Sequence, residues 1–217
     1  MLDFLPRLMG GAIITVEITV LAAGLSVLIA VLAALMRLSN IWIVRKIAGA
    51  YIEAFRGTSA LVQLFWLFFV LPHFGVRLDP ITVGVIGLSL NIGAYGAEVV
   101  RGAILAVPKG QWEATIALNM SPAMRMRRVI LPQAAVAMVP PWGNLFIELL
   151  KATALVSLIT ISDLTFRAYQ LNQATFRTEE IFTLVLGIYL VIALVITALM
   201  RLLERRLGRG MGRGGLR

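Results

Sequence analysis

The 217-residue sequence has no cysteine, a single histidine (His73), and charged side chains at only 14% of its positions. Without cysteine, neither disulfide bonds nor thiolate chemistry can contribute to the fold or to a reaction. One histidine also argues against a histidine-based metal site, because such sites use several ligands of this kind. The charged fraction lies well below the ~25% that is usual in soluble domains. These shortages leave little material for an enzyme active site.

Long apolar runs take the place of the missing charges, and 59% of the residues are hydrophobic. Runs of about 18 or more apolar residues are typical of helices that cross a bilayer. We therefore expect an all-α integral membrane protein with about five transmembrane helices, at about residues 11–36, 58–74, 81–100, 140–161 and 181–203. The first run is too long for a signal-peptide core and no basic segment precedes it, so we interpret it as a retained span.

The basic residues predict the orientation of these spans. With the N-terminus outside, the segments on the cytoplasmic side would contain Arg37, Arg45, Lys46, Arg56, Arg101, Lys109, Arg125, Arg127, Arg128, Arg201, Arg205, Arg206, Arg209, Arg213 and Arg217. The outer segments would contain only Arg7, Arg77, Arg167 and Arg177. Positive charge accumulates on the cytoplasmic side of membrane proteins, so we expect the N-terminus outside and the C-terminus inside. The net charge of +9 then reflects topology, and the Gly/Arg-rich residues 205–217 are interpreted as a disordered cytoplasmic tail near anionic lipid, with no nucleic-acid partner.

A polar stretch at about residues 104–133 interrupts the apolar pattern. Pro108 and Gly110 break the preceding helix, and a short helix of about two turns is predicted from Gln111. Glu113 lies in its first turn, where a carboxylate suits the helix dipole. Asn119 follows the last apolar residue, at the position where a left-handed residue ends many helices.

A second short helix is predicted directly after this turn. Ser121 is a good N-cap, Pro122 fits the first helical position, and Pro132 is expected to end the unit after about Ile130. The stretch therefore forms a helix–turn–helix on the membrane surface. Its small residues, such as Ala114, would allow another protein to approach closely, whereas an amphipathic connector resting on lipid is the alternative. The pattern alone favours neither.

The segment EATIALNMSPAMRMRRVILPQ, residues 113–133, resembles the EAA loop of the permease subunits of bacterial ABC importers. The matching positions are Glu113, Ala114, Asn119, Ile130, Leu131 and Pro132. Thr115 departs from the usual second Ala, and Asn119 replaces the usual Gly while keeping its left-handed turn. Residues 53–69, 91–114 and 148–164 are similar to the polar amino-acid permease branch of this family. Within that branch, RGTSALVQLFW and ALNMSP look most like ectoine and hydroxyectoine permease subunits.

This resemblance implies a type I ABC importer membrane domain, at residues 11–204, in a bacterial inner (plasma) membrane. It implies a cytoplasmic ATPase, a second permease subunit and an external substrate-binding protein as partners, and a polar amino acid or compatible solute as substrate. The ATPase-docking residues would be Pro108, Gly110, Glu113, Ala114, Asn119, Leu131 and Pro132. No lysine of the chain lies in a Gly-x-x-x-x-Gly-Lys-Ser/Thr loop, so ATP would be used by the partner and no cofactor by this chain. A secondary transporter or channel is the alternative, but it gives the helix–turn–helix no role and usually contains an inverted repeat, which is not visible.

Polar residues inside the predicted spans are candidates for a translocation path, because ionisable groups there are costly unless they have partners. Glu148 and Lys151 are three residues apart and share one helix face, where they could pair. They either line the path or form a buried structural ion pair. Gln63, Asn91 and Asn144 could face the same cavity, or could serve hydrogen-bonded packing.

Overall fold

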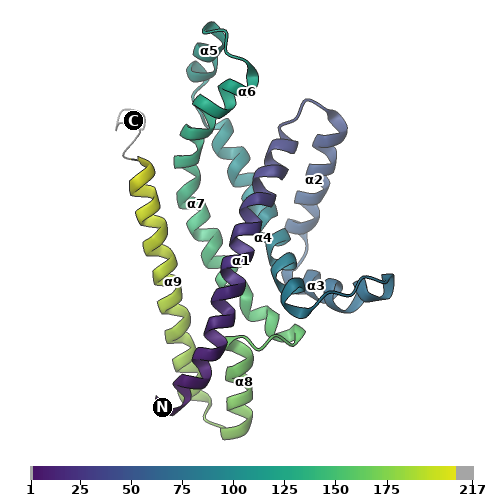
Figure 1. The fold of residues 1–217 in the computed structure, drawn as a ribbon, viewed down its shortest axis with the longest axis vertical. Coiled ribbons are helices and arrows are strands. Elements are labelled where there is room, and N and C mark those ends of the chain that lie inside the picture. The colour runs from purple at the N-terminus through teal and green to yellow at the C-terminus, as the bar shows by residue number, and fades with distance from the viewer. Residues whose placement is uncertain (1, 209–217) are drawn as a thin grey trace.

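The structure, a computed structural model, describes residues 2–208, and every regular element in this part of the chain is helical (Figure 1). In chain order the elements are η1 (Leu2–Phe4), α1 (Leu5–Arg37), α2 (Trp42–Gly57), α3 (Ala60–Phe65), η2 (Trp66–Val70), η3 (Leu71–Phe74), α4 (Pro80–Leu105), α5 (Lys109–Ala117), α6 (Pro122–Arg125), η4 (Met126–Ile130), α7 (Leu131–Ala152), η5 (Thr153–Ile159), α8 (Leu164–Thr175) and α9 (Thr178–Gly208).

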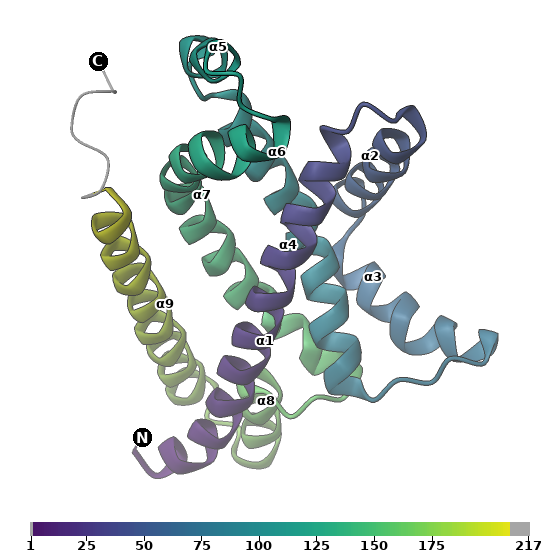
Figure 2. The same cartoon turned by 45° about the horizontal axis from the view of Figure 1, so that its top comes forward.

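The bundle is centred on α1 and α4, which pack against each other along most of their lengths (Figure 2). Small residues make this close packing possible. A Cβ atom at Gly96 would lie 2.5 Å from the ring of Trp142 on α7, and one at Gly93 would lie 2.8 Å from Ile29 on α1. The main apolar core surrounds this contact, and a smaller cluster joins the first turns of α1 to α8 and α9.

Four helical segments are long and apolar enough to cross a membrane: Leu5–Arg37, Pro80–Leu105, Pro122–Ile159 and Thr178–Gly208. A fifth candidate is the pair formed by Trp42–Gly57 and Ala60–Phe74, whose axes meet at 107°. The prediction of an all-helical protein with about five membrane helices is confirmed.

The bounds of the second span differ most from the sequence-based expectation. Residues 60–74 form only one arm of a bent pair, because the chain is extended at Thr58 and turns sharply between α2 and α3. The missing piece is α2, an amphipathic helix whose charged face hides its apolar face from a search for uninterrupted apolar runs. Arg56 therefore lies inside a helix, with its guanidinium 5.4 Å from the ring centre of Tyr95 on α4.

The fourth span also begins earlier than expected. Pro132 does not end a helix, because α6, η4 and α7 follow one another without a break. In the π-helical segment η4, the Leu131 N–H donates to Met126 O, five residues back. This widened turn accommodates Pro132, which has no N–H to donate, at the second position of α7. Pro140 and Pro141 likewise lie inside α7.

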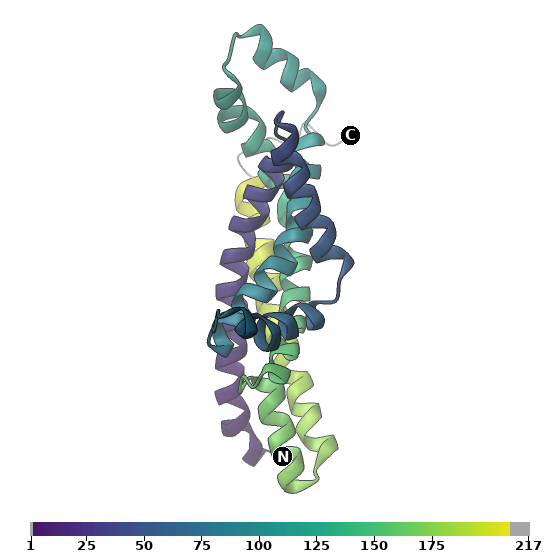
Figure 3. The ribbon, with the colours of Figure 1, turned by 90° about the vertical axis from the view of Figure 1, so that its right-hand side faces the viewer.

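Different elements lie at the two ends of the bundle. The start of α1 and helix α8 lie at one end, and α5, α6 and the last turns of α9 lie towards the other (Figures 1 and 3). This is the arrangement expected from an odd number of crossings. Residues 205–208, predicted to begin a disordered tail, belong to α9, and the rest of the predicted tail lies outside the described residues.

Candidate functional site

The polar insert, residues 104–133, begins where α4 ends at Leu105. Pro108 is the N-cap residue of α5 and its carbonyl accepts a hydrogen bond from the Gln111 N–H (2.9 Å). Gly110 is exposed, and a Cβ atom added there would meet nothing within 4 Å. The break predicted at Pro108 is therefore present, and α5 starts two residues earlier than Gln111.

A Schellman motif ends α5. Asn119 adopts a left-handed conformation with φ 53°, as its position in the sequence predicts. The Asn119 N–H donates to Ile116 O (2.8 Å), and the Met120 N–H donates to Thr115 O (3.0 Å). These two bonds satisfy carbonyl groups that the last helical turn would otherwise leave unpaired. Asn is the best substitute for Gly in this conformation, so the turn of the family pattern is preserved.

The second half of the insert starts as predicted. Ser121 caps α6, with its Oγ accepting from the Met124 N–H (3.4 Å), and Pro122 occupies the first helical turn. Arg125 folds back so that its Nη2 donates to Met120 O (3.5 Å). The turn between α5 and α6 is thus fixed from both sides by hydrogen bonds.

The insert is anchored to the bundle by one face of α5. Thr115, at 2% exposure, is the buried residue of this helix, and its Oγ1 donates to Trp112 O (2.7 Å). Trp112 packs against the main core, and Gln111 Oε1 accepts from Gln133 Nε2 on α7 (3.3 Å). Thr115, the departure from the usual Ala, therefore lies on the anchoring side of the helix.

The opposite face of α5 has no partner in the described part of the chain. Glu113 and Ala114 are exposed, and Glu113 makes no hydrogen bond or ion pair with residues 2–208. Two large apolar residues are exposed beside them, Ile116 at 58% and Leu118 at 74%. Of the other predicted docking residues, Leu131 is half-buried and Pro132 is exposed. A fixed backbone with an exposed apolar and acidic face is suited to contact with another protein.

Within the bundle, the structure joins two of the predicted path residues to each other. Asn91 on α4 is buried, and its Nδ2 donates to Gln63 Oε1 on α3 (3.0 Å) and to Phe55 O on α2 (3.2 Å). Gln63 Nε2 donates to Phe55 O (2.9 Å) and to Thr58 Oγ1 (2.7 Å). These amides satisfy a carbonyl at the end of α2 and hold the bend between α2 and α3. Both amides are therefore engaged in hydrogen-bonded packing within this chain.

The other predicted path residues lie on one face of α7, which we call the polar face: Asn144, Glu148 and Lys151. Their spacing of four and three residues puts them on a single stripe, and all three are exposed. Glu148 and Lys151 do not form an ion pair, and neither has a hydrogen-bond partner in residues 2–208. Within this chain the two side chains are therefore not a buried ion pair. Asn144 lines a pocket of about 210 Å³ between α7 and α9.

A further buried carboxyl group, for which the residue pattern has no signal, lies at the opposite end of the bundle. Asp163 is fully buried at the start of α8, where its Oδ1 accepts from the Phe166 N–H (2.9 Å), while its Oδ2 has no hydrogen-bond partner among residues 2–208. Burial raises the pKa of this carboxyl from 3.8 to about 6. The neighbouring Leu164 N–H donates to Thr15 Oγ1 on α1 (3.1 Å). This junction connects α8 with α1.

In residues 2–208 no group of three or more His, Cys, Asp or Glu side chains is placed to hold a metal ion. The charged residues of the polar face, together with Glu113, Arg127 and Arg128 of the insert, are instead exposed on helix surfaces, and Arg125 is half-buried. Such an arrangement suits contacts with partners or a solute more than it suits bond-making chemistry.

Comparison with known proteins adds an independent line of argument. A family model described as "binding-protein-dependent transport system inner membrane component" matches residues 26–209. The chain is 46% identical over 196 residues to the probable amino-acid ABC transporter permease protein y4tF of Sinorhizobium fredii, covering 88% of this chain and 82% of that protein. It is 39% identical over 190 residues to the glutamine transport system permease protein GlnP of Escherichia coli, covering 87% of each.

A solved structure shows the same fold. It is a crystal structure of an amino acid ABC transporter with histidines, which matches the present structure with a TM-score of 0.88 and 41% sequence identity. The match covers 95% of this chain and 96% of that chain. The match therefore extends over nearly the whole length of both proteins.

Proposed function

Because the chain belongs to the family of binding-protein-dependent transport system inner membrane components, we propose that its insert docks on the cytoplasmic ATPase of an importer and that the polar face of α7 lines the route of the solute. Members of this family are multi-pass inner-membrane subunits of ATP-driven importers, and ATP is hydrolysed by a separate subunit. The chain is accordingly a transport subunit of type I fold, and the alternative of a secondary transporter is set aside.

The observation that carries the docking proposal is the exposed, unpartnered face of a rigid helix. Glu113, Ala114 and Ala117 form this face, while Thr115 and Trp112 hold the other side of α5 to the bundle. A partner that moves α5 would therefore move η4 and α7 with it, because these segments are packed together and continuous. Pro108 and Asn119 lie at the two ends of the docking helix and Gly110 lies in its first turn, while Leu131 and Pro132 begin α7 at the far end of the insert. We propose that residues 11–204 form the transport domain, with the insert on the cytoplasmic side and the N-terminus outside.

The docking proposal is tested by Glu113→Ala in the complete importer, reconstituted in proteoliposomes with its ATPase and binding protein. We expect ATP-dependent uptake and stimulation of the ATPase to fall about 10-fold or more, the loss typical of a residue at the centre of an interface. Glu179→Ala is the matched control, because Glu179 is exposed at the start of α9, at the other end of the bundle. Uptake and ATPase stimulation that both stay unchanged in Glu113→Ala would contradict the docking role.

The path proposal is supported by the environment of Glu148 and Lys151. A charged side chain at the centre of a bilayer costs about 2.5–3.5 kcal/mol on insertion scales. An exposed, unpaired Glu148 on a membrane helix is therefore expected to face water, solute or a second permease subunit rather than lipid. Two such subunits, identical or related, would enclose the path between their polar faces. Gln63 and Asn91 would support it from behind by fixing the α2–α3 bend.

The proposed solute is a polar amino acid or a related compatible solute. The relatives are described as transporters of amino acids in general or of glutamine, and a zwitterion would find opposite charges on Glu148 and Lys151. Ectoine is the more specific prediction, from the segments RGTSALVQLFW and ALNMSP. Competition against uptake by the complete importer tests it: excess ectoine should block uptake of labelled ectoine more strongly than excess glutamine does. The reverse order would contradict ectoine and leave an amino acid as substrate.

A further inference from the structure

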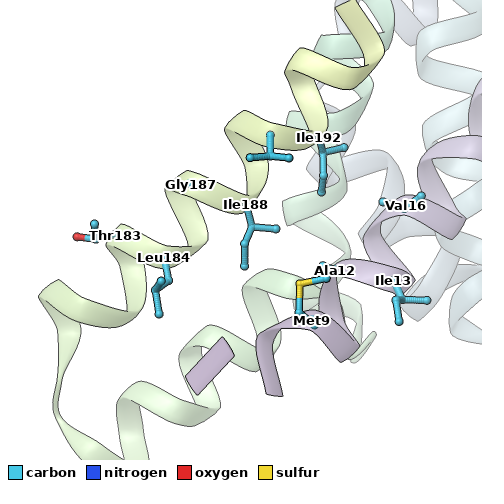
Figure 4. A pocket seen from close by; sticks show the side chains of 10 residues that line it. Met9, Ala12, Ile13, Val16, Thr183, Leu184, Gly187, Ile188 and Ile192 are labelled. Carbon is cyan, nitrogen blue, oxygen red and sulfur yellow. The ribbon is translucent and has the colours of Figure 1, made fainter. Parts of the chain in front are cut away.

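An apolar groove of about 600 Å³ runs between the first half of α1 and the first half of α9 (Figure 4). Its walls include Met9, Ile13 and Val16 on α1 and Leu184 and Ile188 on α9. The groove belongs to neither the insert nor the polar face of α7. Thr183 is its one polar residue, and the Thr183 Oγ1 already donates to Glu179 O (2.6 Å). The groove thus offers an apolar surface with no free hydrogen-bonding group to orient a peptide.

A second pocket, of about 530 Å³, lies on the other side of the α1 N-terminal turns, between α1 and α8. Arg7 and Arg167 both line it, together with Gln170, and no acidic residue does. Both arginines are exposed, and neither has an ion pair with residues 2–208. Two guanidinium groups that share one pocket without a carboxylate repel each other, so an anion bound there would be favoured.

The groove and the arginine pocket are adjacent on the surface of α1. Gly10 lines the pocket and Ile13 lines the groove, and residues three apart are neighbours on a helix surface. Pro6 and Met9 are related in the same way. From Arg7 to Val16 the surface extends about 13 Å along the axis, at 1.5 Å per residue. A charged region near the helix end therefore continues directly into an apolar groove deeper in the bundle.

We propose that this surface is a binding site for an anionic glycerophospholipid, with its phosphate at Arg7 and Arg167 and an acyl chain in the groove between α1 and α9. Arginine binds phosphate oxygens through two parallel N–H groups. The apolar groove has no donor of this kind, so the phosphate is assigned to the arginine pocket. Basic pockets beside apolar helix surfaces are used in this way to bind anionic head groups. The acyl chain would fill the wedge that α1 and α9 leave open beside the apolar cluster to which Leu8 and Ile181 belong. The lipid would then fix α9, whose apolar surface is otherwise mostly exposed.

The test measures the preference of the chain, in the purified complete importer, for phosphatidylglycerol over phosphatidylcholine. Spin-labelled lipids in nanodiscs report the fraction of each lipid that is immobilised. The wild type should prefer phosphatidylglycerol, and Arg7→Gln/Arg167→Gln should reduce that preference about 10- to 30-fold. Arg77→Gln/Arg177→Gln removes the same charge from outside the pocket and should leave the preference unchanged. Equal effects of the two double variants, or no preference in the wild type, would overturn the proposal.

A second pair of variants tests the position of the acyl chain. Gly187→Leu places a side chain in the groove, whereas Gly24→Leu adds one to α1 away from it, and a Cβ atom at either position meets nothing within 4 Å. Only Gly187→Leu should reduce the immobilised fraction of phosphatidylglycerol. Inorganic phosphate should not displace the lipid. Displacement by phosphate together with an unchanged Gly187→Leu variant would assign the arginine pocket to a soluble anion and overturn the lipid site.

Discussion

Two pairs of polar residues lie on the helices of the bundle, in opposite settings. Gln63 and Asn91 are hydrogen-bonded to each other and to backbone carbonyls at the end of α2. Glu148 and Lys151 are exposed on α7, with no partner in residues 2–208. Since a polar group inside a membrane needs a partner, the first pair is satisfied by this chain and the second must be satisfied by something else. The difference separates residues that build the subunit from residues that face another molecule.

The insert follows the same division. Asn119, Ser121 and Thr115 use their polar groups or conformations to fix the backbone. Glu113 does not, and it stands on the exposed face of α5 beside Ala117. Polar residues that are hydrogen-bonded within the chain therefore support the insert and the bundle. Polar residues without such a partner in the described chain are the candidates for contact with another molecule.

Glu148→Gln should have the largest effect on transport. Removing a charged partner of the solute or of the second subunit is worth about 10- to 100-fold in the rate of uptake. The measurement is the initial uptake rate in proteoliposomes that contain the complete importer, with equal amounts of inserted protein. Glu179→Gln, the same change on an exposed helix end, serves as the control.

The reversed pair Glu148→Lys/Lys151→Glu sharpens this prediction. If the two residues held each other in a structural ion pair, exchanging them would restore folding and uptake. Because the structure leaves them unpaired, we expect the double variant to be as inactive as the worse single variant. Recovery of uptake would contradict the division drawn above.

Asp163 extends the comparison to the opposite end of the bundle, where a carboxyl is buried but only half satisfied. Its pKa is about 6 in the folded chain, above its ordinary value of 3.8, because burial disfavours the charged form. The folded state therefore holds the proton more tightly than the unfolded state. Stability is full below pH 3.8 and decreases as the pH rises towards 6, by about 3 kcal/mol in total.

Asp163→Asn should remove this decrease, seen as a melting temperature that no longer falls between about pH 4 and pH 6. The pKa of Asp79 is shifted in the opposite direction. This residue is an exposed N-cap whose pKa is lowered by hydrogen bonds from Thr82, so its contribution is lost as the pH falls. A wild-type melting temperature that rises between pH 4 and 6 would show that Asp163 does not dominate this range.

Local signals in the sequence were sufficient for the turn of the insert. A left-handed Asn119 and a capping Ser121 are each determined by a few adjacent residues, and both are found as predicted. The apolar runs similarly identified α1, α4 and α9, because a long run without charges has few other structures available in a bilayer.

Features that depend on distant residues were harder to predict. The Asn91–Gln63 bond joins residues 28 positions apart, and nothing local distinguishes it from a pair that lines a cavity. Helix α2 was missed because its charged face breaks the apolar run, and Pro132 was assigned as a helix end because the π-helical turn before it leaves no sequence mark. Glu148 and Lys151 have the spacing of an ion pair but do not form one in this chain, because spacing alone does not establish that two side chains meet.

Replacing Asn119 probes the supporting part of the insert. A β-branched residue in the left-handed conformation costs about 1–2 kcal/mol, whereas Gly adopts it freely. Asn119→Val should therefore weaken binding of the ATPase subunit about 5- to 30-fold, if the turn must form before docking, and Asn119→Gly should bind as well as wild type. Binding is measured by titrating the purified ATPase onto the permease. Equal affinities for all three proteins would show that the turn is not needed for docking.

Asn91→Ala should give the smallest effect, a loss of about 1 kcal/mol in stability, the scale of side-chain hydrogen bonds between membrane helices. The variant leaves Gln63 Oε1 without its donor, although Phe55 O keeps its bond from Gln63 Nε2. A double-mutant cycle with Gln63→Ala separates the pair from the rest: the two losses should add to more than the double variant loses, since both remove the same bond.

Asn40→Ala, in the exposed turn before α2, controls for the loss of an amide. Uptake should stay close to wild type wherever the bundle remains folded, because this pair supports the bend and leaves the solute to α7. Strict additivity, or a loss of uptake without a loss of stability, would move Asn91 from the supporting residues to the path itself.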